Sequence, residues 1–208
     1  MRYLFQGDSI TDAGRTSYED PHSLGGGYPY LLQADLQAVW DCDVMNCGIS
    51  GSRVVDLLAR WKKDCLNLEP DVLTIFIGVN DVWHELGDRN GVNPRVFEDV
   101  YRILLREAFE TLPNIRIILM GTFVTHGTAT DPAWEVFNGE VKIRRDITRK
   151  LAEEFGLGYV DLQEVFDKAQ KNLPASHWTA DGVHPTAAGH KLIAQAWKKC
   201  AGIPEVDA

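Results

Sequence analysis

The chain has 208 residues, of which 45% are hydrophobic and 25% are charged, and these values fit one globular domain with a single sizeable core. Its formal net charge is −9, so nucleic acid and anionic membrane surfaces are poor partners. No run approaches the ~20 consecutive apolar residues that cross a bilayer. We therefore expect a single domain over 1–208.

Five short apolar runs predict buried strands, at 3–6, 42–47, 71–77, 115–120 and 158–161. Helical periodicity separates them, at 28–40, 53–68, 95–111, 134–155 and 186–199. Strands that alternate with helices pair in parallel through right-handed crossovers. The pattern predicts an α/β fold, a three-layer α/β/α sandwich around a five-stranded parallel sheet. The longest irregular stretches are expected at 10–27, 84–93, 122–132 and 172–184.

Glycines and small polar residues follow four of these strands, at 7–9, 48–51, 78–81 and 121–122. Because ligands of such sheets bind at the carboxyl ends of the strands, these segments should share one ligand-binding edge. Ser9 follows the first strand directly. Taken alone, it is either the cap of a helix or a nucleophile, and we expect the neighbouring Asp8 to cap or to bond a backbone amide.

A serine nucleophile requires a base, and His184 is the one histidine of six with a carboxylate at a useful spacing in a turn. Asp181 precedes it by three residues, and in a helical turn such a pair lies on the same side. Pro185 favours a helix that begins directly after His184. For this segment alone, a structural interpretation, in which Asp181-Gly182 forms a turn and His184 caps the next helix, competes equally with the catalytic one.

Acyl transfer also requires donors for an oxyanion. The backbone N–H of Ser9 is one candidate, and that of Gly48 is a second because no side chain blocks its approach. Asn80, expected in a turn after the third strand, can offer a side-chain NH₂. Asparagine in such a turn is more often structural. The convergence of three candidates on one sheet edge favours the catalytic interpretation.

Four motifs resemble, in order and over nearly the whole chain, the conserved blocks of the SGNH (GDSL-type) hydrolases: Gly7-Asp8-Ser9, Asn46-x-Gly48-x-Ser50-Gly51, Gly78-x-Asn80-Asp81 and Asp181-x-x-His184. The resemblance implies a flavodoxin-like sheet of strand order 2-1-3-4-5. It also implies Ser9 as nucleophile, His184 as base and then acid, and Asp181 as its orienting carboxylate. The implied oxyanion donors are Ser9 N–H, Gly48 N–H and the Asn80 side chain, without a metal or cofactor.

The flanking segments 5–15, 25–33, 78–83 and 181–197 most resemble carbohydrate esterases that remove acetyl groups from xylan fragments. This implies an acetylated sugar as substrate and an acyl-enzyme on Ser9. Candidate substrate contacts are Tyr28, Arg53, Trp83 and Trp178. For the aromatic side chains, covering the core is the alternative, and for Arg53 it is helix packing.

Three other functions compete with this interpretation. A lysophospholipase or acyl-thioesterase of the same family would differ in acyl-chain length. A metallophosphoesterase is suggested by Asp8, Asn80, Asp81 and His184, but no Asp-x-His pair follows the first strand. A non-catalytic flavodoxin-like binding module would leave Ser9 unreactive.

The remaining polar and reactive residues suggest no further site. The four cysteines form no CxxC pair, and no signal-peptide stretch is visible, so we expect free thiols and a cytoplasmic protein. A basic cluster at 142–150 is expected to be a solvated helix face, and His190 to pack against the sheet. The oligomeric state, including a homo-oligomer, stays open.

Overall fold

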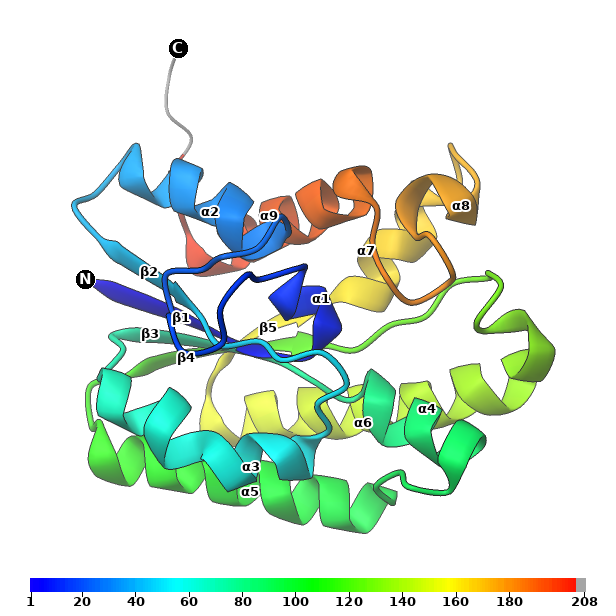
Figure 1. Ribbon diagram of the computed structural model, residues 1–208, viewed down its shortest axis with the longest axis horizontal. Helices are drawn as coiled ribbons and strands as arrows, with labels where there is room; N and C mark the ends of the chain where they lie inside the picture. Colours follow the sequence, from blue (N-terminus) through cyan, green and yellow to red (C-terminus); the bar gives the residue numbers. More distant parts are fainter. Residues whose placement is uncertain (205–208) are drawn as a thin grey trace.

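The computed structural model describes residues 1–204, in which a parallel sheet lies between two layers of helices (Figure 1). The five strands fall within two residues of the apolar runs that predict them. Their bounds are β1 (Arg2–Gly7), β2 (Asp43–Asn46), β3 (Val72–Phe76), β4 (Arg116–Gly121) and β5 (Gly158–Asp161).

The strands lie in the order β2-β1-β3-β4-β5, and every neighbouring pair is parallel. The α/β/α sandwich and the strand order implied by the resemblance are both confirmed. The direction of winding reverses at β1, which lies between β2 and β3. Sheets of this kind bind ligands at such a switch point, which here lies at the carboxyl ends of β1 and β3.

The strands are apolar because both faces of the sheet are covered. All five residues of β3 are buried, including Thr74. Its hydroxyl accepts a hydrogen bond of 2.8 Å from Nε1 of the buried Trp197, so the indole retains a polar partner inside the core. The centre of the sheet is thus tied to the last helix.

One face is covered by α2 and α9, which pack together, and by α7 and α8, which both contact α9 (Figure 1). Their bounds are α2 (Tyr28–Gln37), α7 (Leu162–Ala169), α8 (Ala175–Trp178) and α9 (Ala187–Ala201). The opposite face carries four helices that pack on one another: α3 (Val54–Asp64), α4 (Val79–Asp88), α5 (Pro94–Thr111) and α6 (Trp134–Phe155). Short 3₁₀ turns follow α3 and precede α6, at Leu66–Leu68 and Asp131–Ala133.

Several element boundaries differ from the expectation, and local capping explains the clearest case. The last helix begins at Ala187 rather than directly after His184, because Thr186 caps it with an oxygen that accepts from Gly189 N at 3.2 Å. The stretch 84–93, expected to be irregular, is helical as far as Asp88. Helices α7 and α8 were not expected, and the helix at 53–68 ends early at Asp64.

The basic cluster on α6 is only partly solvated, so the expectation of a fully exposed face is wrong. Arg144 is 3% exposed, pairs with Glu140 and donates to Val92 O at 2.7 Å. Arg145 is also buried and donates to Gln163. The four cysteines are free thiols, as predicted. Among residues 1–204, no helix is both long and apolar enough to cross a membrane.

Candidate active site

Ser9 is the first residue of α1 (Ser9–Asp12), a one-turn helix that starts immediately after β1. Asp8 caps this helix, since its Oδ1 accepts from Ile10 N at 3.0 Å, as the sequence predicted. A side chain at Gly7 would lie 2.5 Å from Phe76 O, so only glycine lets the turn pack this closely against β3. The N–H of Ser9 donates to no group within residues 1–204, which leaves it open at the sheet edge.

His184 reaches Ser9 from the other end of the chain. Its Nε2 lies 2.8 Å from Ser9 Oγ, although 175 positions separate the two residues. The second ring nitrogen, Nδ1, lies 2.7 Å from Asp181 Oδ2. Because an ionised carboxylate accepts only, Nδ1 carries the proton and Nε2 is left to accept from the serine hydroxyl. This is the tautomer that a general base requires.

Asp181 is held as an anion by the turn that carries it. Its Oδ1 accepts from the backbone N–H groups of Val183 and His184, at 2.9 and 2.7 Å. Burial alone would raise the pKa of Asp181, but the His184 ring and these two amides together lower it below its usual value. A carboxylate that stays ionised can stabilise the imidazolium formed during proton transfer.

The turn from Thr179 to Pro185 behaves as one unit. It closes on itself through Ala180 N and His184 O, at 2.8 Å, and through an isolated antiparallel bridge between Thr179 and Pro185. The loop after β4 supports it from outside, where Thr125 N donates to Gly182 O at 2.8 Å. Asp181 and His184 are therefore fixed relative to each other before substrate binds.

Asn80 lies in the first turn of α4 rather than in the expected loop turn. One hydrogen of its side-chain amide is donated to Ser52 O at 3.1 Å, and the other has no acceptor within residues 1–204. Asn80 is 5% exposed, so its buried surroundings hold the side chain, and with it the hydrogen that has no acceptor, in a fixed orientation. Asn80 thus retains one free donor, as an oxyanion site requires.

Gly48 does not offer the donor that the sequence predicted. Its N–H donates to Asn46 Oδ1 at 2.8 Å, and a side chain at Gly48 would lie 2.4 Å from Asp12 N. Gly48 is therefore a packing glycine that lets the end of β2 contact α1. The prediction of a free, rim-facing Gly48 amide is wrong because the asparagine two residues earlier occupies it.

Gly51 is a candidate oxyanion donor that its sequence context did not single out. Its N–H has no partner within the described residues, and its φ of +80° favours glycine. On one side of it Ser50 bonds to Asp12 in α1, and on the other Ser52 accepts from Asn80. Gly51 therefore lies between the helix of the nucleophile and the Asn80 amide. The signal was present in the second glycine of the segment 48–51.

Of the predicted aromatic contacts, Trp83 lies nearest to the proposed chemistry. Its ring centroid is 5.8 Å from that of His184 and 5.9 Å from that of Phe137. Trp178, on α8, packs edge-on against His177, and its buried Nε1 has no partner within residues 1–204. Trp83 can therefore form a wall beside the base, while a substrate contact by Trp178 stays a prediction.

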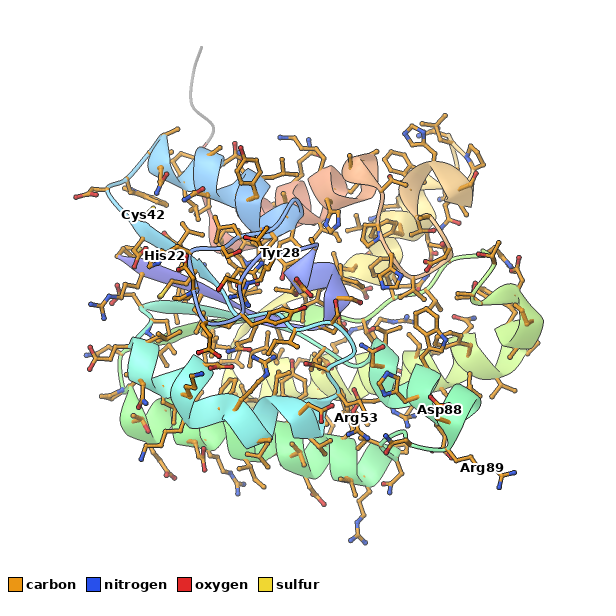
Figure 2. The ribbon with its side chains drawn as sticks, in the orientation of Figure 1. His22, Tyr28, Cys42, Arg53, Asp88 and Arg89 are labelled. Carbon is orange, nitrogen blue, oxygen red and sulfur yellow. The ribbon has the colours of Figure 1, made fainter. Side chains whose placement is uncertain are left out.

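Tyr28 and Arg53, both labelled in Figure 2, do not fit the predicted role in substrate contact. Tyr28 is fully buried, and its hydroxyl bonds to Thr11 Oγ1 at 2.9 Å. Its backbone N–H donates to His190, which is buried and stacks on the Tyr28 ring. The Arg53 guanidinium is bonded to Asp56 and Asn90 at the start of α3. The first prediction is wrong because of burial, and the second is unsupported because the guanidinium is already engaged.

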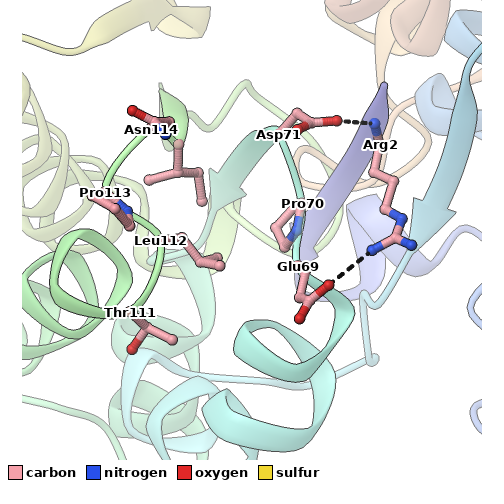
Figure 3. Close-up of a pocket in the computed structure, with 9 residues that line it drawn as sticks. Arg2, Glu69, Pro70, Asp71, Thr111, Leu112, Pro113 and Asn114 are labelled. Carbon is pink, nitrogen blue, oxygen red and sulfur yellow. Dashed lines mark hydrogen bonds and ion pairs between the residues drawn. The ribbon is translucent and has the colours of Figure 1, made fainter.

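Concavity alone does not locate this site. A pocket of about 370 Å³ lies at the amino ends of the strands, where Arg2 donates to Glu69 and to the carboxylate of Asp71 (Figure 3). Ser9 and His184 lie at the opposite, carboxyl edge. Within residues 1–204, no group of three or more His, Cys, Asp or Glu side chains is arranged to hold a metal ion.

Several known proteins are similar to this chain over nearly its whole length. Residues 5–192 match the GDSL-like Lipase/Acylhydrolase family. An acetylxylan esterase from Geobacillus stearothermophilus is 37% identical over 209 residues, which cover 97% of this chain and 94% of that protein.

Solved structures give the same result. A protein from Parabacteroides merdae described as a GDSL-like lipase has a TM-score of 0.90 at 38% identity, over 98% of this chain and 96% of that chain. Axe2, an acetylxylan esterase from Geobacillus stearothermophilus, has a TM-score of 0.88 at 33% identity, over 100% and 96%. The chain therefore belongs to the GDSL-like lipase/acylhydrolase (SGNH) family of carboxylic ester hydrolases.

Proposed function

We propose that this chain is a serine esterase that removes acetyl groups from acetylated oligosaccharides, with xylan fragments as the substrate class. The observation that carries the proposal is the pair of hydrogen bonds that runs from Ser9 through His184 to Asp181, at 2.8 and 2.7 Å. Support for the substrate comes from the acetylxylan esterase that is 37% identical to this chain.

The first half-reaction transfers the acetyl group to Ser9. As Oγ attacks the carbonyl carbon, its proton passes to His184 Nε2, and the carbonyl oxygen becomes an oxyanion. The N–H groups of Ser9 and Gly51 and the free hydrogen of Asn80 are the donors for that oxyanion. When the C–O bond breaks, His184 returns the proton to the sugar oxygen, which leaves as a hydroxyl.

The second half-reaction reverses these roles with water. His184 takes a proton from water, whose oxygen attacks the acetyl carbon on Ser9, and the same donors hold the second oxyanion. His184 then protonates Ser9 Oγ as acetate leaves. Asp181 stays ionised throughout, which its lowered pKa favours. The proposed catalytic cycle uses only these side chains, the backbone amides and water.

The test of this proposal compares initial rates on acetylated xylo-oligosaccharides with rates on nitrophenyl esters of acetate, butyrate and octanoate. We expect hydrolysis of the first group and a rate on the nitrophenyl esters that falls as the acyl chain grows. Ser9→Ala should abolish turnover and labelling by a fluorophosphonate probe. It should change the free energy of unfolding by less than about 1 kcal/mol, because Ser9 does not cap the helix.

Each of the competing functions gives a different result. Preference for octanoate over acetate would indicate a lysophospholipase or thioesterase and contradict the acetyl specificity. A wild-type protein that neither turns over esters nor reacts with the probe would be a binding module. Turnover by Ser9→Ala near the parent rate would refute the nucleophile itself.

A further inference from the structure

Asp12 ends the one-turn helix that Ser9 begins, and its carboxylate gathers four hydrogen bonds. Oδ2 accepts from Ser50 Oγ at 2.6 Å, from Ser50 N at 3.1 Å and from the Tyr18 hydroxyl at 2.8 Å. Oδ1 accepts from Arg15 N at 2.9 Å. Two of these donors belong to the loop after β2, so the carboxylate joins two segments that are far apart in the sequence.

Asp12 is 2% exposed, and its carboxylate has no ion pair within residues 1–204. Burial alone would raise the pKa of Asp12, but the bonds from Ser50, Arg15 and Tyr18 outweigh it and lower that pKa. Asp12 is therefore an anion at neutral pH. A buried anion is costly to leave unpartnered, so these donors are held firmly in place.

The loop that Asp12 holds is the one that carries Gly51. Ser50, whose N–H and hydroxyl both bond to Asp12, directly precedes Gly51. Ser52, which directly follows, accepts from Asn80 through its carbonyl. The Gly51 peptide is thus held from both sides: Ser50 ties it to the helix that carries Ser9, and Ser52 ties it to Asn80. Asn46 strengthens the contact with α1 by donating to Thr11 O at 2.7 Å.

We propose that Asp12 is a positioning residue that sets the distance between the Ser9 and Gly51 amides and so builds the oxyanion site. This inference rests on the proposed role of Ser9 as nucleophile. Asp12 does not touch substrate; it acts through Ser50. Since a misplaced oxyanion donor weakens binding of the transition state more than binding of the ester, the loss should appear in kcat rather than in KM.

The variant that tests this is Asp12→Asn. Its amide can present only one oxygen, so either the Ser50 N–H or the Arg15 N–H faces an NH₂ group and loses its acceptor. Tyr18→Phe is the matched control, because it removes one bond to the same oxygen and leaves both Ser50 bonds intact. Ser50→Ala is intermediate, since it keeps the backbone bond and loses the hydroxyl.

For Asp12→Asn we expect kcat to fall by about 10²-fold, the order found when an oxyanion donor is lost, with KM within about threefold. Inhibition by an alkyl boronic acid, which forms a tetrahedral adduct on serine, should weaken in parallel. Tyr18→Phe should stay within about threefold of the parent in kcat and in boronate inhibition, because the Gly51 peptide keeps its place. Loss of folded enzyme would not weaken the inhibition constant, so the boronate separates mispositioning from instability.

Amide hydrogen exchange of the peptide spanning 49–52 gives a readout that does not depend on hydrolysis. We expect faster exchange there in Asp12→Asn and no change in Tyr18→Phe. If the parent hydrolyses esters but Asp12→Asn matches Tyr18→Phe in kcat and in exchange, the positioning role is refuted. If the parent hydrolyses nothing while exchange rises in Asp12→Asn alone, the anchoring of the loop by Asp12 stands and the esterase proposal fails.

Discussion

In the proposed mechanism, the reactivity of Ser9 depends on which nitrogen of His184 carries the proton. The Asp181 carboxylate determines this, because it accepts from Nδ1 at 2.7 Å and leaves Nε2 facing Ser9 Oγ. The other carboxylate oxygen accepts hydrogen bonds from two backbone N–H groups. A change of one atom at Asp181 can therefore stop the reaction without displacing any neighbouring residue.

Asp181→Asn is expected to lower kcat by roughly 10⁴-fold, because an amide NH₂ facing Nδ1 favours the tautomer with the proton on Nε2. The measurement is single-turnover acylation of Ser9 at neutral pH. Binding of a substrate analogue should change little, since Asp181 lies behind the histidine. A loss of less than tenfold would mean that another group orients His184.

The raised pKa of Asp8 leads us to expect that the free energy of unfolding falls as pH rises. Burial is the largest cause that raises its pKa to about 7, above the 3.8 of an unperturbed carboxyl. Between those two values the folded protein holds a proton that the unfolded chain has released, so the free energy of unfolding falls as pH rises through this window. Asp81 is raised to about 7 in the same way, again mainly by burial.

Asp8→Asn should therefore stabilise the protein at pH 8 relative to pH 5, by on the order of 1 kcal/mol. Asparagine keeps the cap on Ile10 N, so the substitution removes the titrating charge alone. Urea unfolding at the two pH values measures the difference. An equal effect of the substitution at both would show that Asp8 does not titrate in this range.

At the scale of elements, the base and its carboxylate depend on a glycine in their turn. Gly182 has a φ of +101°, and a side chain there would lie 2.4 Å from Thr130 Oγ1 and 2.7 Å from Thr125 O. The loop after β4 therefore packs so closely against the turn that a Cβ atom at Gly182 would clash with it. Gly202, at the end of α9, also has a positive φ but has open space around it.

Gly182→Ala should lower both stability and kcat, while Gly202→Ala should cost only the roughly 1–2 kcal/mol of a left-handed alanine and leave kcat unchanged. Thermal unfolding and initial rates on nitrophenyl acetate measure the two effects. Equal losses of stability in both variants, with kcat unaltered in each, would show that the loop does not hold the turn.

Strands and motif residues could be predicted because their signals are local. Buried runs such as Val72–Phe76 stand out in the sequence, and so does the spacing of Asp181 and His184. Helix starts could not be read as well, since a competing cap decides them: Thr186 moves the start of α9 past the proline. Gly48 was misassigned because its amide is occupied by Asn46, a contact that only the folded loop creates.

At the scale of the whole molecule, the sheet brings together at one edge the candidate site residues from segments that are far apart in the sequence. The ends of β1, β2 and β3 contribute Ser9, Gly51 and Asn80, and the turn before α9 contributes the base.

Because the proposed reaction uses only protein groups and water, prolonged treatment with a chelator should leave kcat unchanged. The measurement is initial rate on nitrophenyl acetate after dialysis against EDTA, with readdition of Mg²⁺ or Zn²⁺ as the control. Activity that disappears with the chelator and returns with a metal would support the metallophosphoesterase type of site and contradict the serine mechanism.

The separation of 175 positions between Ser9 and His184 also has a consequence for biosynthesis. During synthesis Ser9 leaves the ribosome 175 positions before His184, and β1 can pair with β2 and β3 well before the turn at 179–185 has been made. In the proposed mechanism, the hydroxyl of Ser9 therefore lacks its base until the turn at 179–185 has folded, and hydrolysis begins only after that step. Completion of the fold is itself the step that activates the proposed enzyme.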